Sequence, residues 1–316
     1  MSLLFVADPL EAFKTYKDTT FAMMREAARR GHELWACEPA DLVWVRGARV
    51  VARHARAITL TGDDERWFDV VAERELALAD VQAVLMRKDP PFDSEYFYAT
   101  HLLQQAEREG ARVFNKPAAL RDHPEKLAIL EFPEWITPTL VTRSEHAVRA
   151  FHAEHGDIIV KPLDGMGGRG IFRVGADGMN LGAIVETIGG HGSITVMVQR
   201  FLPEIVHGDK RILLIDGEPV PYCLARIPQG SEVRGNLAVG GKGVAQPLSA
   251  SDREIAQALG AVLRTRGLLL VGLDVIGDRL TEINVTSPTC FQEIAQQTGF
   301  DVARMFVDAL ERALAS

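Results

Sequence analysis

The sequence predicts an α/β protein made of more than one lobe, and three observations support this prediction. Hydrophobic residues make up 47% and charged residues 25% of the 316 residues, as in ordinary globular proteins. In the N-terminal part, short apolar runs alternate with helical patterns, which is typical of an open, largely parallel sheet. After about residue 120 hairpins and helices follow, as in α+β lobes, and the chain is longer than one small domain requires.

The N-terminal part is expected to place functional loops at one edge of its sheet. Its predicted elements are strands at 3–7, 33–37, 81–87 and 111–114, helices at 19–30 and 93–109, and a hairpin at 43–60. Asp18 or Thr19 can cap the first helix, because their side-chain oxygens accept free backbone N–H groups. In open α/β sheets, ligands bind beyond the carboxyl ends of the strands, where Asp8, Arg87 and Asn115 lie.

The rest of the chain is predicted to form two further domains, so that the three domains cover 1–120, 121–202 and 203–316. Its predicted elements are helices near 125–131 and at 145–154, 181–189, 251–265 and 301–314, strands at 157–162, 171–174, 195–202, 210–215 and 218–227, and a hairpin at 268–285. Segment 228–243 is rich in glycine and poor in apolar residues. Such a segment cannot pack a core of its own, so we expect it to be a mobile loop. Unstructured loops of this length are usually functional.

The segment DGMGGRG at 164–170 lies between two predicted strands. Its spacing matches the dinucleotide-binding GxGxxG, but that motif opens a helix and here a strand follows. The glycines therefore predict a hairpin tip whose N–H groups can cover phosphates, with Lys161 at its foot to contact phosphate oxygens. A plain flexible turn beside a surface lysine is the alternative that this segment alone leaves open.

Residues 272–285 predict a hairpin with acidic side chains on one face. Glu282 and Asn284 are two residues apart and share a face, and Asp274 on the partner strand can converge with Glu282. Two carboxylates and an amide oxygen suit Mg²⁺, with phosphates completing its coordination. A hairpin whose polar face is only hydrated is the alternative. Taken together, the glycine hairpin, the lysine, the long loop and this acidic hairpin predict a site that holds ATP and activates a carboxylate.

Charge and cysteine content exclude several classes of protein. The net charge is -8 and no basic patch is evident, so a nucleic-acid partner is not expected. Cys37, Cys223 and Cys290 are far apart, which excludes a disulfide framework and a cysteine zinc site and favours a reducing compartment. The N-terminus does not resemble a signal peptide, and the apolar run at 268–273 is too short to cross a bilayer. We therefore expect a cytoplasmic protein with no membrane partner.

Six stretches spread over the chain carry a resemblance to a known family. They are LMRKDPPFD (85–93), FNKP (114–117), KPLDGMGG (161–168), GDKRILLIDGEPVPYCLARIPQG (208–230), RGNLAVGGKG (234–243) and GLDVIGDRLTEINVTSPTC (272–290). They resemble the ATP-grasp superfamily and, within it, the prokaryotic glutathione synthetases. The resemblance implies an ATP-grasp fold with an N-terminal substrate domain, a central lid and a C-terminal domain. It also implies that γ-glutamylcysteine and glycine are joined through an acyl phosphate, giving glutathione, ADP and phosphate.

The resemblance also implies which residues form the site. Those implied to bind ATP are Lys126, Lys161, Gly165, Met166, Gly167, Gly168, Gln199, Arg200, Phe201, Leu202, Asp209 and Lys210. Those implied to bind the dipeptide and glycine are Arg87, Asp89, Asn236, Ser287, Pro288 and Thr289. The implied metal ligands are Asp274, Glu282 and Asn284, and the implied catalytic cations are Arg211, Arg226 and Arg234.

The implied cofactors and partners are ATP as co-substrate, two Mg²⁺ or Mn²⁺ ions, and further copies of the chain in a dimer or tetramer. Another carboxylate–amine ligase of the same architecture, with different amino-acid substrates, is the alternative. A nucleotide-binding regulatory module without turnover is disfavoured, because both lysines and the acidic set are present.

Overall fold

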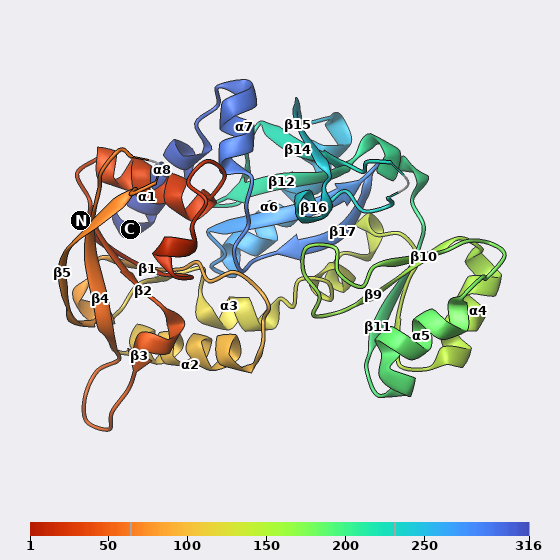
Figure 1. The fold of residues 1–316 in the computed structure, drawn as a ribbon, viewed down its shortest axis with the longest axis horizontal. Coiled ribbons are helices and arrows are strands. Elements are labelled where there is room, and N and C mark those ends of the chain that lie inside the picture. The colour runs from red at the N-terminus through yellow and green to blue at the C-terminus, as the bar shows by residue number, and fades with distance from the viewer. Residues whose placement is uncertain (64, 231, 316) are drawn as a thin grey trace.

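The computed structural model describes residues 1–63, 65–230 and 232–315, which form three sheets with helices packed against them (Figure 1). We name them the N-terminal, central and C-terminal sheets. Figure 1 shows the central sheet at one end of the molecule, away from the N-terminus, with the C-terminal sheet between the other two. None of the helices in the described residues has the length and hydrophobicity that a membrane span requires.

The N-terminal sheet has parallel strands at its centre and an antiparallel ribbon at one edge. The parallel strands, in spatial order, are β2 (Glu33–Cys37), β1 (Ser2–Val6), β6 (Ala83–Met86) and β7 (Val113–Phe114). The antiparallel strands are β3 (Leu42–Val43), β4 (Val51–Leu60) and β5 (Phe68–Ala77). The helices of this part are α1 (Thr19–Arg29), α2 (Ser94–Arg108) and α3 (Pro117–Asp122). Asp18 caps α1 by accepting a hydrogen bond of 2.7 Å from the Phe21 amide, and the central strands confirm the predicted parallel sheet.

The central sheet is antiparallel, and helices cover one of its faces. Its strands, in spatial order, are β10 (Phe172–Val174), β9 (Ile158–Pro162), β11 (Val196–Arg200) and β8 (Thr139–Thr142), and its helices are α4 (Glu145–His155) and α5 (Leu181–Gly189). Strand alternation places Ile158 and Val160 under the helices, in a separate hydrophobic cluster. Ile159 and Lys161 therefore point to the other face. The loop between β9 and β10 joins two strands, as predicted for the glycine segment.

The C-terminal sheet is antiparallel and shares its hydrophobic core with the N-terminal sheet. Its strands, in spatial order, are β15 (Lys242–Pro247), β14 (Tyr222–Ile227), β12 (Asp209–Ile215), β16 (Leu270–Ile276) and β17 (Arg279–Asn284), with β13 (Glu218–Pro219) beside β12. The helices here are α6 (Ala250–Thr265), α7 (Phe291–Thr298) and α8 (Val302–Ala315). One cluster joins Val6 to Ile212 and Val271, and another joins Phe5 to Leu213.

Several elements differ from the predicted ones. The helix expected near 125–131 is a short 3₁₀ segment, Ala128–Glu131, that follows α3. Strands β5, β8 and β15 and helices α3 and α7 were not predicted. Most of β5 is exposed, so it lacks the alternation that marks a half-buried strand. Helix α7 begins after Cys290, whose side chain makes no capping hydrogen bond.

The predicted mobile loop at 228–243 contains some regular structure. Residues Leu237–Val239 form a 3₁₀ turn, and β15 already begins at Lys242. Residue 231, which falls within this predicted loop, lies outside the described residues. The remaining 3₁₀ segments are Leu10–Ala12, Pro39–Asp41, Leu78–Asp80, Pro133–Trp135, Gly190–Gly192 and Pro203–His207.

Candidate active site

Two adjoining cavities lie where the central sheet faces the C-terminal sheet. The first, which we call the lysine cavity, has a volume of about 90 Å³ and contains Lys161 in its wall. The second, which we call the arginine cavity, has a volume of about 200 Å³ and contains Arg211 and Arg226. Both cavities share Lys126, Ile171, Asn236 and Glu282. A ligand group placed at this junction would therefore be in contact with both cavities.

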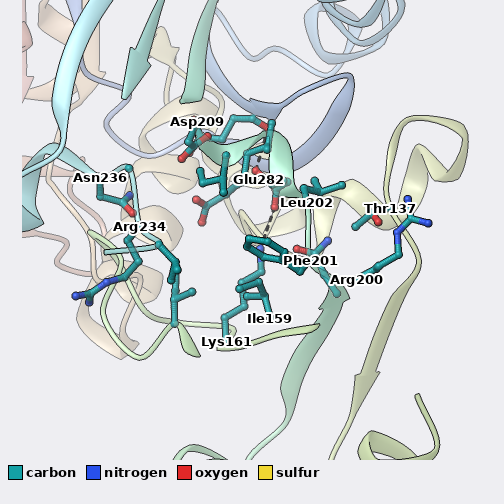
Figure 2. A pocket seen from close by; sticks show the side chains of 18 of the residues that line it. Thr137, Ile159, Lys161, Arg200, Phe201, Leu202, Asp209, Arg234, Asn236 and Glu282 are labelled. Atoms are coloured by element: carbon teal, nitrogen blue, oxygen red, sulfur yellow. Dashed lines mark hydrogen bonds between the residues drawn. The ribbon is translucent and has the colours of Figure 1, made fainter. Parts of the chain in front are cut away.

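One end of the lysine cavity is apolar and lies beside strand β11. Ile159, Phe201 and Leu202 line it, and Figure 2 shows them together with Thr137 and Arg200. Gln199, the last inward-facing residue of β11, also lines the cavity, and its Nε2 donates a hydrogen bond of 3.0 Å to Thr139 Oγ1. A flat aromatic base suits this end, because apolar walls cover its faces and the strand's polar groups meet its edge.

The polar end of the lysine cavity holds two buried ammonium groups. Lys126 Nζ lies 3.1 Å from Glu282 Oε1, and it also donates hydrogen bonds to the carbonyl oxygens of Leu163 and Gly165. Lys161 Nζ donates to the Thr281 carbonyl oxygen at 3.2 Å. Burial lowers the pKa of Lys161 to about 8, because the charged form loses hydration. Two cations close together favour a ligand with several negative oxygens.

The predicted acidic hairpin forms with the expected register, since Asp274 lies opposite Glu282 and Gly272 opposite Asn284. The two carboxylates have different surroundings. Asp274 is buried and accepts hydrogen bonds from Arg211 Nε at 2.5 Å and Nη2 at 3.1 Å, and Arg226 Nη2 lies 2.9 Å from its Oδ2. Burial alone would raise the pKa of Asp274, but the two guanidinium groups hold it well below its usual range. Asp274 is therefore a fixed anion.

Asp209 is the second acid that Arg226 contacts. One of its oxygens, Oδ2, pairs with Arg226 Nη2, whereas Oδ1 is buried and has no hydrogen-bond partner among the described residues. Burial raises the pKa of Asp209 to about 6 against the opposing effect of Arg226. Because Asp209 lines the lysine cavity, the unpartnered oxygen can accept a hydrogen bond from a ligand placed there.

The oxygen atoms near the junction fit a hard divalent cation that is also held by phosphates. Glu282 has a side chain that is 20% exposed and Lys126 as its ion-pair partner. Asn284 Nδ2 donates to Gly272 O at 3.2 Å, and the side chain lines the arginine cavity. Within the described residues no three His, Cys, Asp or Glu side chains are grouped to hold a metal. Phosphate oxygens would have to complete the coordination, as is usual for Mg²⁺. Asp274 is less available, because both its oxygens contact arginines.

The arginine cavity is covered by two glycine-rich segments that contact each other. Arg234 Nη1 donates a hydrogen bond of 3.0 Å to the Gly168 carbonyl oxygen. Gly168 has a φ of +82°, and a Cβ there would lie 2.7 Å from Asn236 Oδ1. Only glycine allows this close approach of the 164–170 hairpin tip to the 234–238 segment. The contact closes the cavity on the side of the central sheet.

The structure brings most of the predicted site residues to these two cavities. The ones in the wall of at least one cavity are Asp89, Lys126, Lys161, Gly165, Met166, Gly167, Gly168, Gln199, Arg200, Phe201, Leu202, Asp209, Arg211, Arg226, Arg234, Asn236, Asp274, Glu282, Asn284, Ser287 and Thr289.

Arg87, Pro288 and Lys210 do not line either cavity. Arg87 is buried behind the arginine cavity and donates hydrogen bonds of 3.1 Å to Thr20 Oγ1 and to the Pro288 carbonyl oxygen. Lys210 points away from the cavities, because alternation along β12 places it on the face opposite Asp209 and Arg211. Its Nζ pairs with Asp252 at the start of α6 and donates to Gly277 O at 2.8 Å.

Several cavity residues were not predicted. Ile159 could have been found from its spacing of two residues from Lys161 on the same strand. Cys290 is 1% exposed but lies in the wall of the arginine cavity. Glu125 also lines this cavity, and the only feature of the sequence that could have indicated this is its position immediately before Lys126. Burial and the nearby charge of Glu282 raise the pKa of Glu125.

Comparisons with known proteins agree with this geometry. A family model described as the N-terminal domain of prokaryotic glutathione synthetase matches residues 1–121, and one described as its ATP-grasp domain matches residues 125–299. A glutathione synthetase of Ralstonia nicotianae is 62% identical over 313 residues, which are 99% of this chain and 96% of the relative. One of Nitrosomonas europaea is 57% identical over 318 residues, covering 100% of this chain and 99% of the relative.

Solved structures show the same fold at lower identity. D-cycloserine synthetase DcsG aligns with 99% of this chain and 100% of its own, with a TM-score of 0.70 at 17% identity. The ATP-grasp ligase PsnB complexed with minimal precursor aligns over 99% of both chains, with a TM-score of 0.64 at 21% identity. These likenesses establish the ATP-grasp fold alone. The family models and the full-length relatives go further, and they show that the chain belongs to the prokaryotic glutathione synthetase family, within the ATP-grasp superfamily.

Proposed function

We infer that this chain is an ATP-dependent ligase that joins γ-glutamylcysteine to glycine, producing glutathione, ADP and phosphate. Its membership of the glutathione synthetase family supports this reaction. The observation in the structure that carries it is the junction of the two cavities at Lys126 and Glu282. A nucleotide in one cavity would place its terminal phosphate beside a carboxylate in the other, as phosphorylation of that carboxylate requires.

We propose that ATP occupies the lysine cavity. The adenine would lie against Ile159 and Leu202, with its edge toward the 199–202 strand end. The unpartnered Oδ1 of Asp209 would accept a hydrogen bond from a hydroxyl of the ribose. The phosphates would extend to Lys126 and Lys161 and beneath the amides of the 165–168 hairpin tip. In this assignment both ammonium groups contact the negatively charged phosphates, and the apolar walls at the other end cover the flat adenine ring.

We propose that Glu282 and Asn284 hold Mg²⁺ or Mn²⁺ together with the phosphates, with Asp274 beside them as a fixed anion. A divalent ion bound there would neutralise charge on the transferring phosphoryl group. Whether one or two ions bind can be measured by titrating Mn²⁺ by electron paramagnetic resonance in the presence of ADP.

The chain's own groups would support two successive steps. An oxygen of the cysteinyl carboxylate attacks the γ-phosphorus, forming an O–P bond while the P–O bond to ADP breaks. The ammonium group of glycine first loses one proton to solvent, and its nitrogen then attacks the acyl carbon. As the C–N bond forms, the C–O bond to phosphate breaks and the nitrogen gives a second proton to the departing phosphate, keeping one hydrogen in the amide. Arg211 and Arg226 would stabilise the negative oxygens, as would Arg234 from the covering segment. The closed glycine segments would exclude water, which would otherwise hydrolyse the acyl phosphate.

An ADP-release assay tests this function. With amino acids as acceptors, we expect release only when γ-glutamylcysteine and glycine are both present, with glutathione identified as the product by mass spectrometry. Other dipeptides and other amino acids, and a reaction without the dipeptide, serve as controls. Equal turnover with unrelated amino-acid pairs, or release of ADP without any acceptor, would contradict the proposal.

Two further features of the organisation are proposals. We propose that 1–120, 121–202 and 203–316 are the three domains, since the helix-covered face of the central sheet has a hydrophobic cluster of its own. We also propose that the chain forms a homo-oligomer, a dimer or a tetramer, as its family resemblance implies. Light scattering coupled to size-exclusion chromatography measures the oligomeric state directly.

A further inference from the structure

The two carboxylate oxygens of Glu125 have different surroundings. Oε1 accepts three hydrogen bonds, from Val285 N at 3.1 Å, Thr286 N at 3.2 Å and Thr286 Oγ1 at 2.8 Å. The backbone carbonyl oxygen of Glu125 also accepts from Ile283 N at 2.9 Å. Among the described residues, none donates a hydrogen bond to Oε2. The side chain is therefore held firmly by one oxygen while the other is available.

Glu125 also has no cation beside it among the described residues. Three other acids around the two cavities each have one: Asp274 has Arg211, Asp209 has Arg226, and Glu282 has Lys126. Asp89 also lines the arginine cavity without an ion pair, but no donor among the described residues holds its carboxylate in place. Across residues 1–63, 65–230 and 232–315, no such ion pair involves Glu125. Glu125 is half-buried, and a half-buried carboxylate without a counter-charge is less stable than a paired one unless a ligand supplies that charge.

The position of Glu125 suits a ligand that reaches the junction from the side of the dipeptide. It lies in the wall of the arginine cavity with Asn284 and Ser287, and it directly precedes Lys126, which both cavities share. The negative charge of Glu282 acts on it from nearby. The available oxygen of Glu125 is thus close to the place where an acyl phosphate would form.

The ligation needs an amine at this place, and an amino acid brings its amine as an ammonium ion. Most charged groups in the cavity wall repel such an ion, since Arg211, Arg226 and Lys126 are cations. Glu282 and Asp274 are already paired with these cations. A carboxylate that is fixed, unpaired and exposed to the cavity is the group that attracts an ammonium ion to the junction.

We propose that Oε2 of Glu125 binds the ammonium group of the incoming amino acid and holds its nitrogen beside the acyl carbon. The inference rests on the proposed function, because it assigns the position of the acceptor in that reaction. Glu125 would combine two tasks, since Oε1 fastens the 285–286 backbone beside the metal-binding strand while Oε2 faces the substrate.

Replacing Glu125 with glutamine separates these two tasks. In Glu125→Gln a carbonyl oxygen remains to accept the three hydrogen bonds from Val285 and Thr286, so the fastening is kept. The negative charge is lost, and an amide group faces the cavity instead. A purely structural role predicts little change, whereas an ammonium-binding role predicts a selective loss of glycine use.

The experiment compares glycine with hydroxylamine as the nucleophile in the full-length enzyme. Hydroxylamine is uncharged at neutral pH and traps the acyl phosphate as a hydroxamate, so it needs no ammonium-binding carboxylate. In Glu125→Gln we expect kcat/KM for glycine to fall by about 10²-fold, with an unchanged KM for ATP. We expect the hydroxylamine-dependent rate to stay within about threefold of the wild-type rate.

A matched control is Glu293→Gln, which makes the same change at another acid with an unpartnered buried oxygen, Oε2, outside both cavities. The ratio of glycine to hydroxylamine rates should not change in this control. Glu125→Asp is a second variant, which keeps the negative charge but places it one methylene farther from the cavity. It should lower the same ratio by a smaller factor, and it keeps the test decisive if the glutamine variant does not fold.

Three outcomes would overturn the inference. Equal losses with glycine and hydroxylamine in the folded Glu125 variants would mean that Glu125 only fastens the 283–286 segment. A wild-type ratio in both Glu125 variants would mean that no charge is needed there. If the wild-type enzyme releases no ADP with γ-glutamylcysteine and either nucleophile, the proposed function fails, and the inference that rests on it fails too.

Discussion

The two carboxylates of the acidic hairpin, Asp274 and Glu282, lie opposite each other but differ in how their charge is balanced. Asp274 belongs to an inner cluster with Asp209, Arg211 and Arg226, in which each acid contacts an arginine. Glu282 belongs to an outer pair with Lys126 and is partly exposed to both cavities. The inner cluster is neutral without a ligand, so it can shape the site. The outer pair leaves the carboxylate oxygens of Glu282 and the ammonium group of Lys126 available to a ligand.

The largest effect is expected from breaking the inner cluster. Arg226→Met would leave Asp209 without its cation and Asp274 with only one, and both acids are buried. We expect the free energy of unfolding to fall by about 3–5 kcal/mol, measured by chemical denaturation. Arg253→Met, the same change at an exposed position on α6, should cost less than about 0.5 kcal/mol. Equal stability of the two variants would mean that the cluster is not held by its ion pairs.

The outer pair should behave in the opposite way, with activity lost and stability kept. Glu282→Gln removes a proposed metal ligand, so kcat should fall by about 10²-fold or more because charge on the phosphoryl group is less well neutralised. The melting temperature should stay near that of the wild type, since the Glu282 side chain is 20% exposed and glutamine keeps its size. A normal kcat in this variant, with unchanged dependence on Mg²⁺, would remove Glu282 from the proposed metal site.

The pH dependence of ATP use gives a sharper test of the outer region. Burial lowers the pKa of Lys161 to about 8, so its ammonium loses its proton as the pH rises through that value. We expect kcat/KM for ATP to fall above about pH 8, approaching tenfold per pH unit. The stability of the fold should change with pH in the opposite direction. Between about pH 8 and 10.5, Lys161 is more often protonated in the unfolded chain than in the folded protein. Its contribution to the free energy of unfolding therefore increases with pH over this range.

The matched variant is Lys161→Arg, whose guanidinium stays charged over this range. Its activity should be lower at neutral pH, because a planar fork differs from a point charge, but the fall above pH 8 should disappear. If the variant shows the same alkaline fall as the wild type, another group is responsible for it.

The smallest effect is expected at the cover of the arginine cavity. Segment 234–238 is held to the central sheet by the bond from Arg234 to Gly168, so it should open at little cost. We expect trypsin to cleave the free protein after Arg234, and ATP with Mg²⁺ and γ-glutamylcysteine to protect it, as followed by gel electrophoresis and mass spectrometry. Equal cleavage with and without the ligands would mean that the segment does not close over them.

The sequence predicted the acidic hairpin better than the inner cluster. Glu282 and Asn284 follow from strand alternation within one hairpin, and the register of that hairpin brings Asp274 opposite Glu282. The contacts of Asp274 with Arg211 and Arg226 depend on how three separate strands are ordered, which local patterns do not contain.

Lys210 is a second residue whose contacts depend on the arrangement of the sheet and could not be predicted locally. The resemblance grouped it with the ATP-binding residues, but β12 turns it toward Asp252 on the opposite face of the sheet. Lys210 lies outside both cavities, and its role in ATP binding stays a prediction. Strand β5 escaped prediction for a different reason, because its exposed position removes the apolar alternation from which strands are predicted.

The separate hydrophobic cluster of the central sheet affects which part of the molecule opens most easily. Its eight buried side chains lie between the sheet and helices α4 and α5, and they are not continuous with the two larger clusters. Small cooperative units of this kind open more easily than the rest of a protein. Amide hydrogens of β9, β10 and α5 should therefore exchange with deuterium before those of β12 and β16. In our proposal a bound nucleotide contacts the opposite face of the same strands, so it should slow exchange there the most.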